Sequence, residues 1–243
     1  MKERAFVIGD IHGEYQMLKQ LLTYWTPEEE ELIFVGDLID RGPQIFKTLE
    51  LVWSLQKEYD AKVIMGNHEA LFLDFLQHPN QAWDLYQRNG GATTLASLNH
   101  LALDEINDFQ LDELVNLTIE NYPHLMAWLE NLPLYLEYGE WIIVHAGVDL
   151  QLTNWKQSKP SDFYWIRDPF HLGDNRTGKK IIFGHTPVKL LNATPGDLSI
   201  WHHQGKFGID GGAVYGGDLI GAHITQSGEL LKENRVTQGV DQK

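Results

Sequence analysis

The sequence contains no cysteine. Disulfide bonds, thiolate metal sites and cysteine nucleophiles are therefore excluded. Long apolar runs are also missing, because no stretch approaches the roughly 18 consecutive apolar residues of a membrane-spanning helix. The segment Met1 to Arg4 precedes an apolar run of only five residues, which does not resemble a signal peptide. We therefore expect a cytoplasmic protein with no membrane partner.

Basic residues are few in this chain. There are 19 Lys and Arg residues against 34 Asp and Glu residues, and the formal net charge is −15. This balance disfavours nucleic acid and anionic surfaces as general partners, because such polyanions are bound through clustered cations. Local basic spots remain compatible with it. We expect no nucleic-acid partner, and the sequence does not define an oligomeric state.

Apolar residues, in contrast, make up 43% of the 243 positions. This content supplies a sizeable core for a single domain spanning residues 1–243. Short, continuously apolar runs predict buried strands. These runs cover residues 5–9, 32–36, 62–66, 141–144 and 180–184.

Helical patterns lie between the first three runs, over residues 17–25 and 45–53, and Pro43 is expected at the start of the second helix. This order is typical of consecutive βαβ units, so the chain belongs to the α/β class. Residues 75–135 predict several short helices inserted between the third and fourth strands. Short strands resume at residues 206–210 and 218–225, and residues 233–243 are expected to form a frayed polar tail.

A side chain able to bind metal follows each of the five apolar runs. Ligands bind at the carboxyl ends of strands in α/β sheets, so these side chains are expected to meet in one site. Oxygen and imidazole ligands without sulfur suit manganese, iron, zinc or magnesium. Six ligands are too many for one catalytic ion with open positions, which favours two ions sharing a carboxylate. The six residues are Asp10, His12, Asp37, Asn67, His145 and His185.

The motifs that carry these residues resemble the calcineurin-like metallophosphoesterases. The resemblance is strongest to the branch of serine/threonine protein phosphatases and diadenosine tetraphosphate hydrolases. It implies a β-sandwich flanked by helices, with a dinuclear metal centre. The matching blocks are Gly9-Asp10-Ile11-His12-Gly13, Gly36-Asp37-Leu38-Ile39-Asp40-Arg41-Gly42, Gly66-Asn67-His68-Glu69, His145-Ala146-Gly147 and Gly184-His185-Thr186.

The resemblance also implies a role for individual residues. Asp10, His12 and Asp37 are expected to bind the first metal ion. Asp37 is expected to bridge to the second ion, whose other ligands would be Asn67, His145 and His185. Manganese is the expected metal, with iron, zinc or magnesium as alternatives.

Further residues are expected to act on the substrate. His68 resembles the general acid and Asp40 the carboxylate that orients it. Arg41 and Arg167 would bind phosphate together with Asn67. Glu69 is expected to cap a helix start or to support the ligands. The sequence allows Asp210 and Tyr215 to face the site and leaves their role open.

The expected activity is hydrolysis of phosphoester bonds by direct attack of a metal-bound hydroxide. Phosphoprotein or general phosphomonoester substrates are preferred at this stage, and dinucleoside polyphosphates are the alternative. An aromatic wall and a basic groove would favour that alternative. A nuclease is disfavoured because Thr186 and Pro187 follow His185, where nucleases of this superfamily carry a second histidine. A non-catalytic scaffold is disfavoured because all six ligands and His68 are present.

Overall fold

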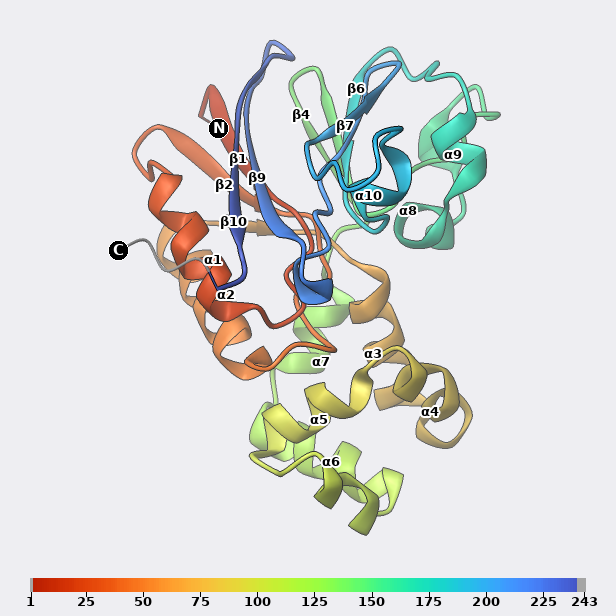
Figure 1. The fold of residues 1–243 in the computed structure, drawn as a ribbon. Coiled ribbons are helices and arrows are strands. Elements are labelled where there is room, and N and C mark those ends of the chain that lie inside the picture. The colour runs from red at the N-terminus through yellow and green to blue at the C-terminus, as the bar shows by residue number, and fades with distance from the viewer. Residues whose placement is uncertain (1, 240–243) are drawn as a thin grey trace.

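Two five-stranded sheets form the centre of the molecule in the computed structural model, which describes residues 2–239 (Figure 1). The first sheet has the order β10-β9-β1-β2-β3. Its strands β1, β2 and β3 are parallel, and β9 and β10 extend it in antiparallel fashion. Their bounds are β1 Arg4–Ile8, β2 Glu30–Phe34, β3 Lys62–Val63, β9 Asp218–Thr225 and β10 Leu230–Thr237.

The second sheet has the order β4-β5-β6-β8-β7. The strands β5, β6 and β8 are parallel, and the edge strands β4 and β7 are antiparallel to their neighbours. This sheet therefore also gathers the carboxyl ends of its central strands on one side. Its bounds are β4 Tyr135–Tyr138, β5 Trp141–Val144, β6 Lys180–Phe183, β7 Trp201–His203 and β8 Lys206–Gly208.

Alternating side chains place the two sheets face to face. In β1, Ala5 and Val7 pack in the core between the sheets, whereas Phe6 and Ile8 point to the opposite face. That outer face is covered by α1 (Tyr15–Leu21) and α2 (Ile45–Tyr59). The outer face of the second sheet is covered by the segment that holds α8 (Pro160–Trp165) and α9 (Asp168–Leu172). The expected sandwich flanked by helices is confirmed.

A separate helical lobe lies below the two sheets in Figure 1. It forms between β3 and β4, and its helices share one apolar core with the outer face of the first sheet. The helices begin at Asn67, eight residues before the expected start of the insertion. The bounds are α3 Asn67–Gln77, α4 Pro79–Arg88, α5 Gly91–Asn99, η2 Asp104–Asp108, α6 Leu111–Asn121 and α7 Leu125–Glu130.

Several local predictions were wrong. Pro43 lies before α2, whose N-cap is Gln44, so it does not form the first turn. Only Lys62 and Val63 of the third run pair as a strand. Residues 233–237 are not a frayed tail, because they belong to β10 and pair with β9. Residues 238–239 form a turn, and residues 240–243 of the predicted tail lie outside the described residues. No helix within residues 2–239 is long and apolar enough to cross a membrane.

Candidate dinuclear metal and phosphate site

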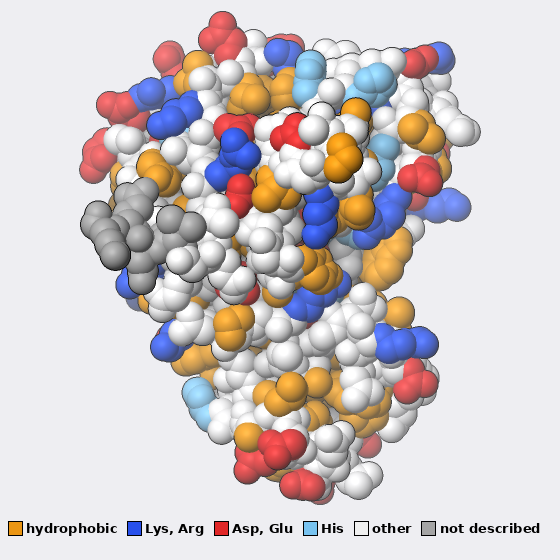
Figure 2. All heavy atoms as spheres, in the orientation of Figure 1, with side chains coloured by type: hydrophobic (Ala, Val, Ile, Leu, Met, Phe, Trp, Pro, Cys, Tyr) orange, Lys and Arg blue, Asp and Glu red, His pale blue; other side chains and the backbone are white. Residues whose placement is uncertain are grey.

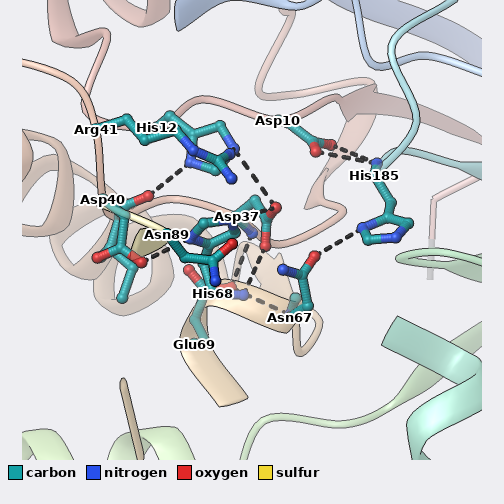
Figure 3. Close-up of polar contacts among 12 residues, drawn as sticks. Asp10, His12, Asp37, Asp40, Arg41, Asn67, His68, Glu69, Asn89 and His185 are labelled. Carbon is teal, nitrogen blue, oxygen red and sulfur yellow. Dashed lines mark hydrogen bonds and ion pairs between the residues drawn. The ribbon is translucent and has the colours of Figure 1, made fainter. Parts of the chain in front are cut away.

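The predicted site residues leave the carboxyl ends of strands in both sheets. Asp10 and His12 follow β1, and Asp37 follows β2. Asn67 and His68 open α3 shortly after β3, which turns their side chains toward the same point (Figure 3). His145 and His185 arrive from the second sheet, after β5 and β6. The site therefore lies where the ends of the two sheets meet above the helical lobe.

Asp37 is the centre of this arrangement. Its Oδ2 lies 3.5 Å from His12 Nε2, and its Oδ1 lies 3.4 Å from His145 Nε2. Two groups of possible metal ligands share Asp37, namely His12, Asp37 and His68 on one side and Asp37, His145 and His185 on the other. The carboxylate thus faces two histidine clusters with different oxygens, which is the geometry that a bridging ligand needs.

The Nε2 atom of His145 faces oxygen atoms of two other candidate ligands, Asn67 and Asp37. His145 Nδ1 lies 2.8 Å from the carbonyl oxygen of Val35, which can only accept, so Nδ1 carries the proton. Burial lowers the pKa of His145, so the ring is neutral and its Nε2 is an acceptor. That Nε2 lies 3.0 Å from Asn67 Oδ1 and 3.4 Å from Asp37 Oδ1, which are acceptors too. Acceptors that face one another require a cation, so these residues fit a metal ion.

His12 is oriented in the same way as His145, whereas His185 turns its Nδ1 toward another candidate ligand, Asn67. His12 Nδ1 lies 2.7 Å from the carbonyl oxygen of Ile39, which leaves Nε2 directed into the site. Burial lowers the pKa of His12 to about 3, so this ring is also neutral. His185 Nδ1 lies 2.7 Å from Asn67 Oδ1, and its buried Nε2 has no hydrogen-bond partner within residues 2–239. Carbonyl contacts behind the ring are typical of metal-binding histidines.

Asp10 lies at the edge of the two ligand groups. Its carboxylate oxygens accept from the backbone N–H of His185 at 3.0 and 3.2 Å. Asp10 lines the same cavity as His12 and Asp37, but neither ligand group of three includes it. The structure therefore brings Asp10 to the site while directing it toward His185 rather than toward His12.

Buried carboxylates concentrate negative charge here. Burial is the main cause that raises the pKa of Asp10 well above its ordinary value, and Asp210 and Asp37 add to it. Burial also raises the pKa of Asp210 to about 6. Burial acts on Asp37 in the same direction, but the attraction of the surrounding histidines, His145 and His68 first, outweighs it wherever they carry a proton and then holds the pKa of Asp37 below its ordinary value. A cluster of buried carboxylates is typical of a cation-binding site.

His68 and Asp40 form a buried pair next to the ligands. His68 Nδ1 lies 2.6 Å from Asp40 Oδ2. Burial lowers the pKa of His68, but the carboxylates of Asp37 and Asp40 outweigh this effect and raise it above its ordinary value. Asp40 Oδ1 accepts from the hydroxyls of Tyr86 at 3.0 Å and Thr94 at 2.5 Å. Tyr86 and Thr94 belong to the helical lobe, and the sequence motifs did not reveal them.

Glu69 supports the loops that present the ligands. Its carboxylate accepts from the backbone N–H groups of Gly66, Asp37 and Leu38 at 2.8–3.1 Å. The contact with Gly66 caps the start of α3, while the other two fix the turn that carries Asp37. The expectation that Glu69 caps a helix or supports the ligands is confirmed. Gly66 must be glycine, because a Cβ there would lie 2.3 Å from Asp37 Oδ1.

Basic and aromatic side chains surround the site. Arg41 Nη1 lies 2.7 Å from His12 Nε2, and Arg167 Nη1 donates to Thr186 Oγ1 at 3.0 Å. Both arginines line a cavity of about 360 Å³ that is also lined by five of the six metal-ligand candidates, all but His145. Asp210 lies in its wall and accepts from the backbone N–H of Gly212 at 2.8 Å. The cavity also exposes side chains that carried no sequence prediction of a role: Trp165, Lys189, Leu190 and Tyr215.

The sandwich and its site define a metallophosphoesterase. The family described as calcineurin-like phosphoesterase matches residues 4–224, and the chain belongs to this family. The protein is therefore a metal-dependent phosphoric ester hydrolase. The family uses a dinuclear divalent metal centre, which the His and Asp groups fit.

Curated relatives carry two kinds of name. Bis(5'-nucleosyl)-tetraphosphatase PrpE (asymmetrical) from Oceanobacillus iheyensis is 30% identical and aligns over 88% of this chain and 85% of its own length. The protein of the same name from Anoxybacillus flavithermus is 32% identical over 88% and 87%. Serine/threonine-protein phosphatase 1 from Salmonella typhimurium is 30% identical over 90% and 91%.

A solved structure shows the same fold. The crystal structure of a putative diadenosine tetraphosphatase superposes with a TM-score of 0.65 at 19% identity, covering 98% of this chain and 94% of that one. At this identity the similarity concerns the fold alone.

Proposed function

We propose that this protein hydrolyses dinucleoside polyphosphates, with diadenosine tetraphosphate as the representative substrate. The observation that carries the proposal is the cavity lining, in which cations and exposed aromatic rings stand beside the metal-ligand candidates. Cations suit a phosphate chain, and aromatic rings suit the stacking of a nucleobase. The tetraphosphatase name of relatives at 30–32% identity supports this choice. The residues are Arg41, Arg167, Lys189, Trp165 and Tyr215.

The six ligand candidates would hold two divalent cations, with Asp37 between them and manganese as the expected metal. When bound, such cations supply an activated water molecule and neutralise the phosphoryl oxygens. The residues that we assign to this role are Asp10, His12, Asp37, Asn67, His145 and His185.

The protein groups then direct the displacement. Arg41 and Arg167 bind the oxygens of the phosphate under attack, and Asn67 contributes to the same subsite. The water oxygen forms a bond to phosphorus as the bond from phosphorus to the leaving oxygen breaks. His68, held through Nδ1 by Asp40, gives its Nε2 proton to that leaving oxygen.

Phosphoprotein hydrolysis is the second candidate. A relative at 30% identity that is named serine/threonine-protein phosphatase 1 supports it. The same metal centre and acid would serve both reactions, so the two candidates differ only in what binds around the reacting phosphate.

A paired assay separates the two candidates. The protein would be stripped of metal, reconstituted with Mn²⁺ and given diadenosine tetraphosphate or a phosphoserine peptide at equal concentration. We expect kcat/KM to favour the dinucleotide by about 100-fold or more. A preference of that size for the peptide would contradict the proposal. The Asp37→Asn variant, which removes the carboxylate shared by both groups of possible metal ligands, serves as the control for activity that does not arise at this site.

A further inference from the structure

Lys189 lies at the mouth of the cavity, outside every predicted motif. It is an exposed residue of α10 (Val188–Leu191), the short helix that follows His185. Its Nζ lies 5.8 Å from the ring centroid of Tyr215, and the Cζ of Arg41 lies 5.4 Å from the same centroid. One aromatic ring therefore has two cations next to it, and all three side chains line the cavity.

The cations of this cavity have no acidic partners. Within residues 2–239, Arg41, Arg167 and Lys189 form no ion pair with a carboxylate, whereas Lys156, Lys179 and Arg235 do. The carboxylates of the same cavity, Asp10, Asp37 and Asp210, are buried. In this described part of the chain the three cations form no ion pair with them, so they stay available to an anionic ligand. Figure 2 shows Lys and Arg side chains beside apolar ones at the middle of this face, where the sheets meet the helical lobe.

This cluster is larger than a single phosphate needs. Arg41 and Arg167 reach inward, where their guanidinium groups contact His12 and Thr186. Lys189 stands on the outer side, next to Tyr215. A lysine ammonium is a compact charge on a flexible stem, which suits a phosphate whose position varies, whereas the planar arginines suit the phosphate that must be held for reaction.

We propose that Lys189, beside the ring of Tyr215, forms a second phosphate subsite, which binds the phosphate adjoining the one that Arg41 and Arg167 hold. The subsite selects a phosphoanhydride chain over an isolated phosphomonoester. This inference rests on the proposed function and makes it more specific. The chemistry recognised is a polyphosphate chain, which a dinucleoside polyphosphate or an inorganic polyphosphate can supply.

The test compares Lys189→Met with Lys232→Met. Lys232 is a matched control because it is also exposed and lies 5.7 Å from a tyrosine ring, that of Tyr24, away from the cavity. With Mn²⁺ present, we expect Lys189→Met to lower kcat/KM for diadenosine tetraphosphate about tenfold through KM. Hydrolysis of a phosphoserine peptide should stay within about twofold in both variants. An equal loss on the peptide, or no loss on the dinucleotide, would overturn the inference.

A binding measurement keeps the test decisive if the proposed function fails. Inorganic tripolyphosphate would be titrated as an inhibitor of peptide hydrolysis and, by calorimetry, against the Mn²⁺-loaded protein. We expect Lys189→Met to weaken its binding about tenfold. Unchanged binding would refute the subsite even for an enzyme that is inactive on dinucleotides. Tighter binding of a non-hydrolysable dinucleotide than of tripolyphosphate would identify the nucleotide as the source of the chain, and equal binding would identify polyphosphate in general.

Discussion

Five residues of the site hold a left-handed backbone conformation that most side chains avoid. Their φ angles lie between 46° and 69°, and within residues 2–239 they make up five of the eight non-glycine residues with positive φ. Each costs about 1–3 kcal/mol, which the surrounding hydrogen bonds must offset. The backbone strain is therefore concentrated in the loops that carry the candidate site residues. The five residues are His12, Asp37, Asp40, Arg41 and His185.

The variant His68→Asn tests whether the single residue His68 is the general acid. We expect kcat on the phosphoserine peptide to fall by about 10²–10⁴-fold, because the leaving alkoxide is a strong base that needs a proton. The loss on diadenosine tetraphosphate should be smaller, because a leaving phosphate is a weaker base. Steady-state kinetics on both substrates, with metal analysis of the variant, would check this. Wild-type turnover of the peptide would contradict the assignment of His68.

The sequence motifs located the candidate metal ligands that the structure brings together, because each stands next to a glycine or at a strand end. They did not locate Tyr86, Thr94 or Lys189. Tyr86 and Thr94 donate hydrogen bonds to Asp40, although they lie 46 and 54 positions from it in the sequence. No local sequence pattern predicts such a contact. Lys189 lies in no sequence motif, and only its position beside Tyr215 in the folded protein points to a role.

At the scale of elements, the helical lobe supports the site, because it contacts Asp40 and Arg41. Helix α4 supplies Tyr86, α5 supplies Thr94, and the turn between them supplies the carbonyl of Gly90, which accepts from the backbone N–H of Arg41 at 3.4 Å. The lobe thus holds the carboxylate of Asp40 and the backbone of Arg41, which in the proposed mechanism orient the acid and bind phosphate.

Tyr86→Phe tests this role. The ring is fully buried and stacks on Phe72 and Phe75, so the substitution removes only the hydrogen bond to Asp40. We expect a loss of about 1 kcal/mol in stability and a several-fold fall in kcat. Tyr138→Phe is the matched control, because Tyr138 is also buried and donates one hydrogen bond, to the carbonyl of Lys2. Denaturant unfolding should show similar losses for both variants, and only Tyr86→Phe should change kcat.

Sequence patterns predicted buried strands well and exposed ones poorly. The continuously apolar runs became β1, β2, β5 and β6, because strands covered on both faces need no polar side. The edge strands β4, β7 and β10 were missed. In β10 five of the eight side chains are polar and four are exposed, and its order comes from pairing with β9 rather than from its composition.

At the scale of the whole molecule, a buried histidine outside the site makes stability depend on pH. His171 stacks on Phe183, and its Nε2 has no partner within residues 2–239. Burial lowers its pKa to about 4. The unfolded chain therefore takes up this proton from about pH 6.5 downward, while the folded protein does not until about pH 4. Stability is lost as the pH falls through this window.

We expect His171 to contribute up to about 2 kcal/mol of destabilisation between pH 7 and pH 5. His171→Phe should flatten the pH dependence of the free energy of unfolding by this amount. The exposed His124→Phe serves as the control. Urea titrations at several pH values, with wild type and both variants under the same metal conditions, measure the difference. Parallel curves for His171→Phe and wild type would contradict the assignment.

The ligand set described above comes from both sheets, and this has a mechanical consequence. Asp10 and His12 leave the first sheet, whereas His185 leaves the second, nearly the whole domain later in the chain. Metal ions bound between these residues would cross-link segments that lie most of the domain apart in the sequence. The protein has no disulfide that could do so. Because these ions would bind only the folded state, the stabilisation that they add rises with the free metal concentration. The same ions that serve chemistry would thus set how firmly the two halves of the sandwich stay together.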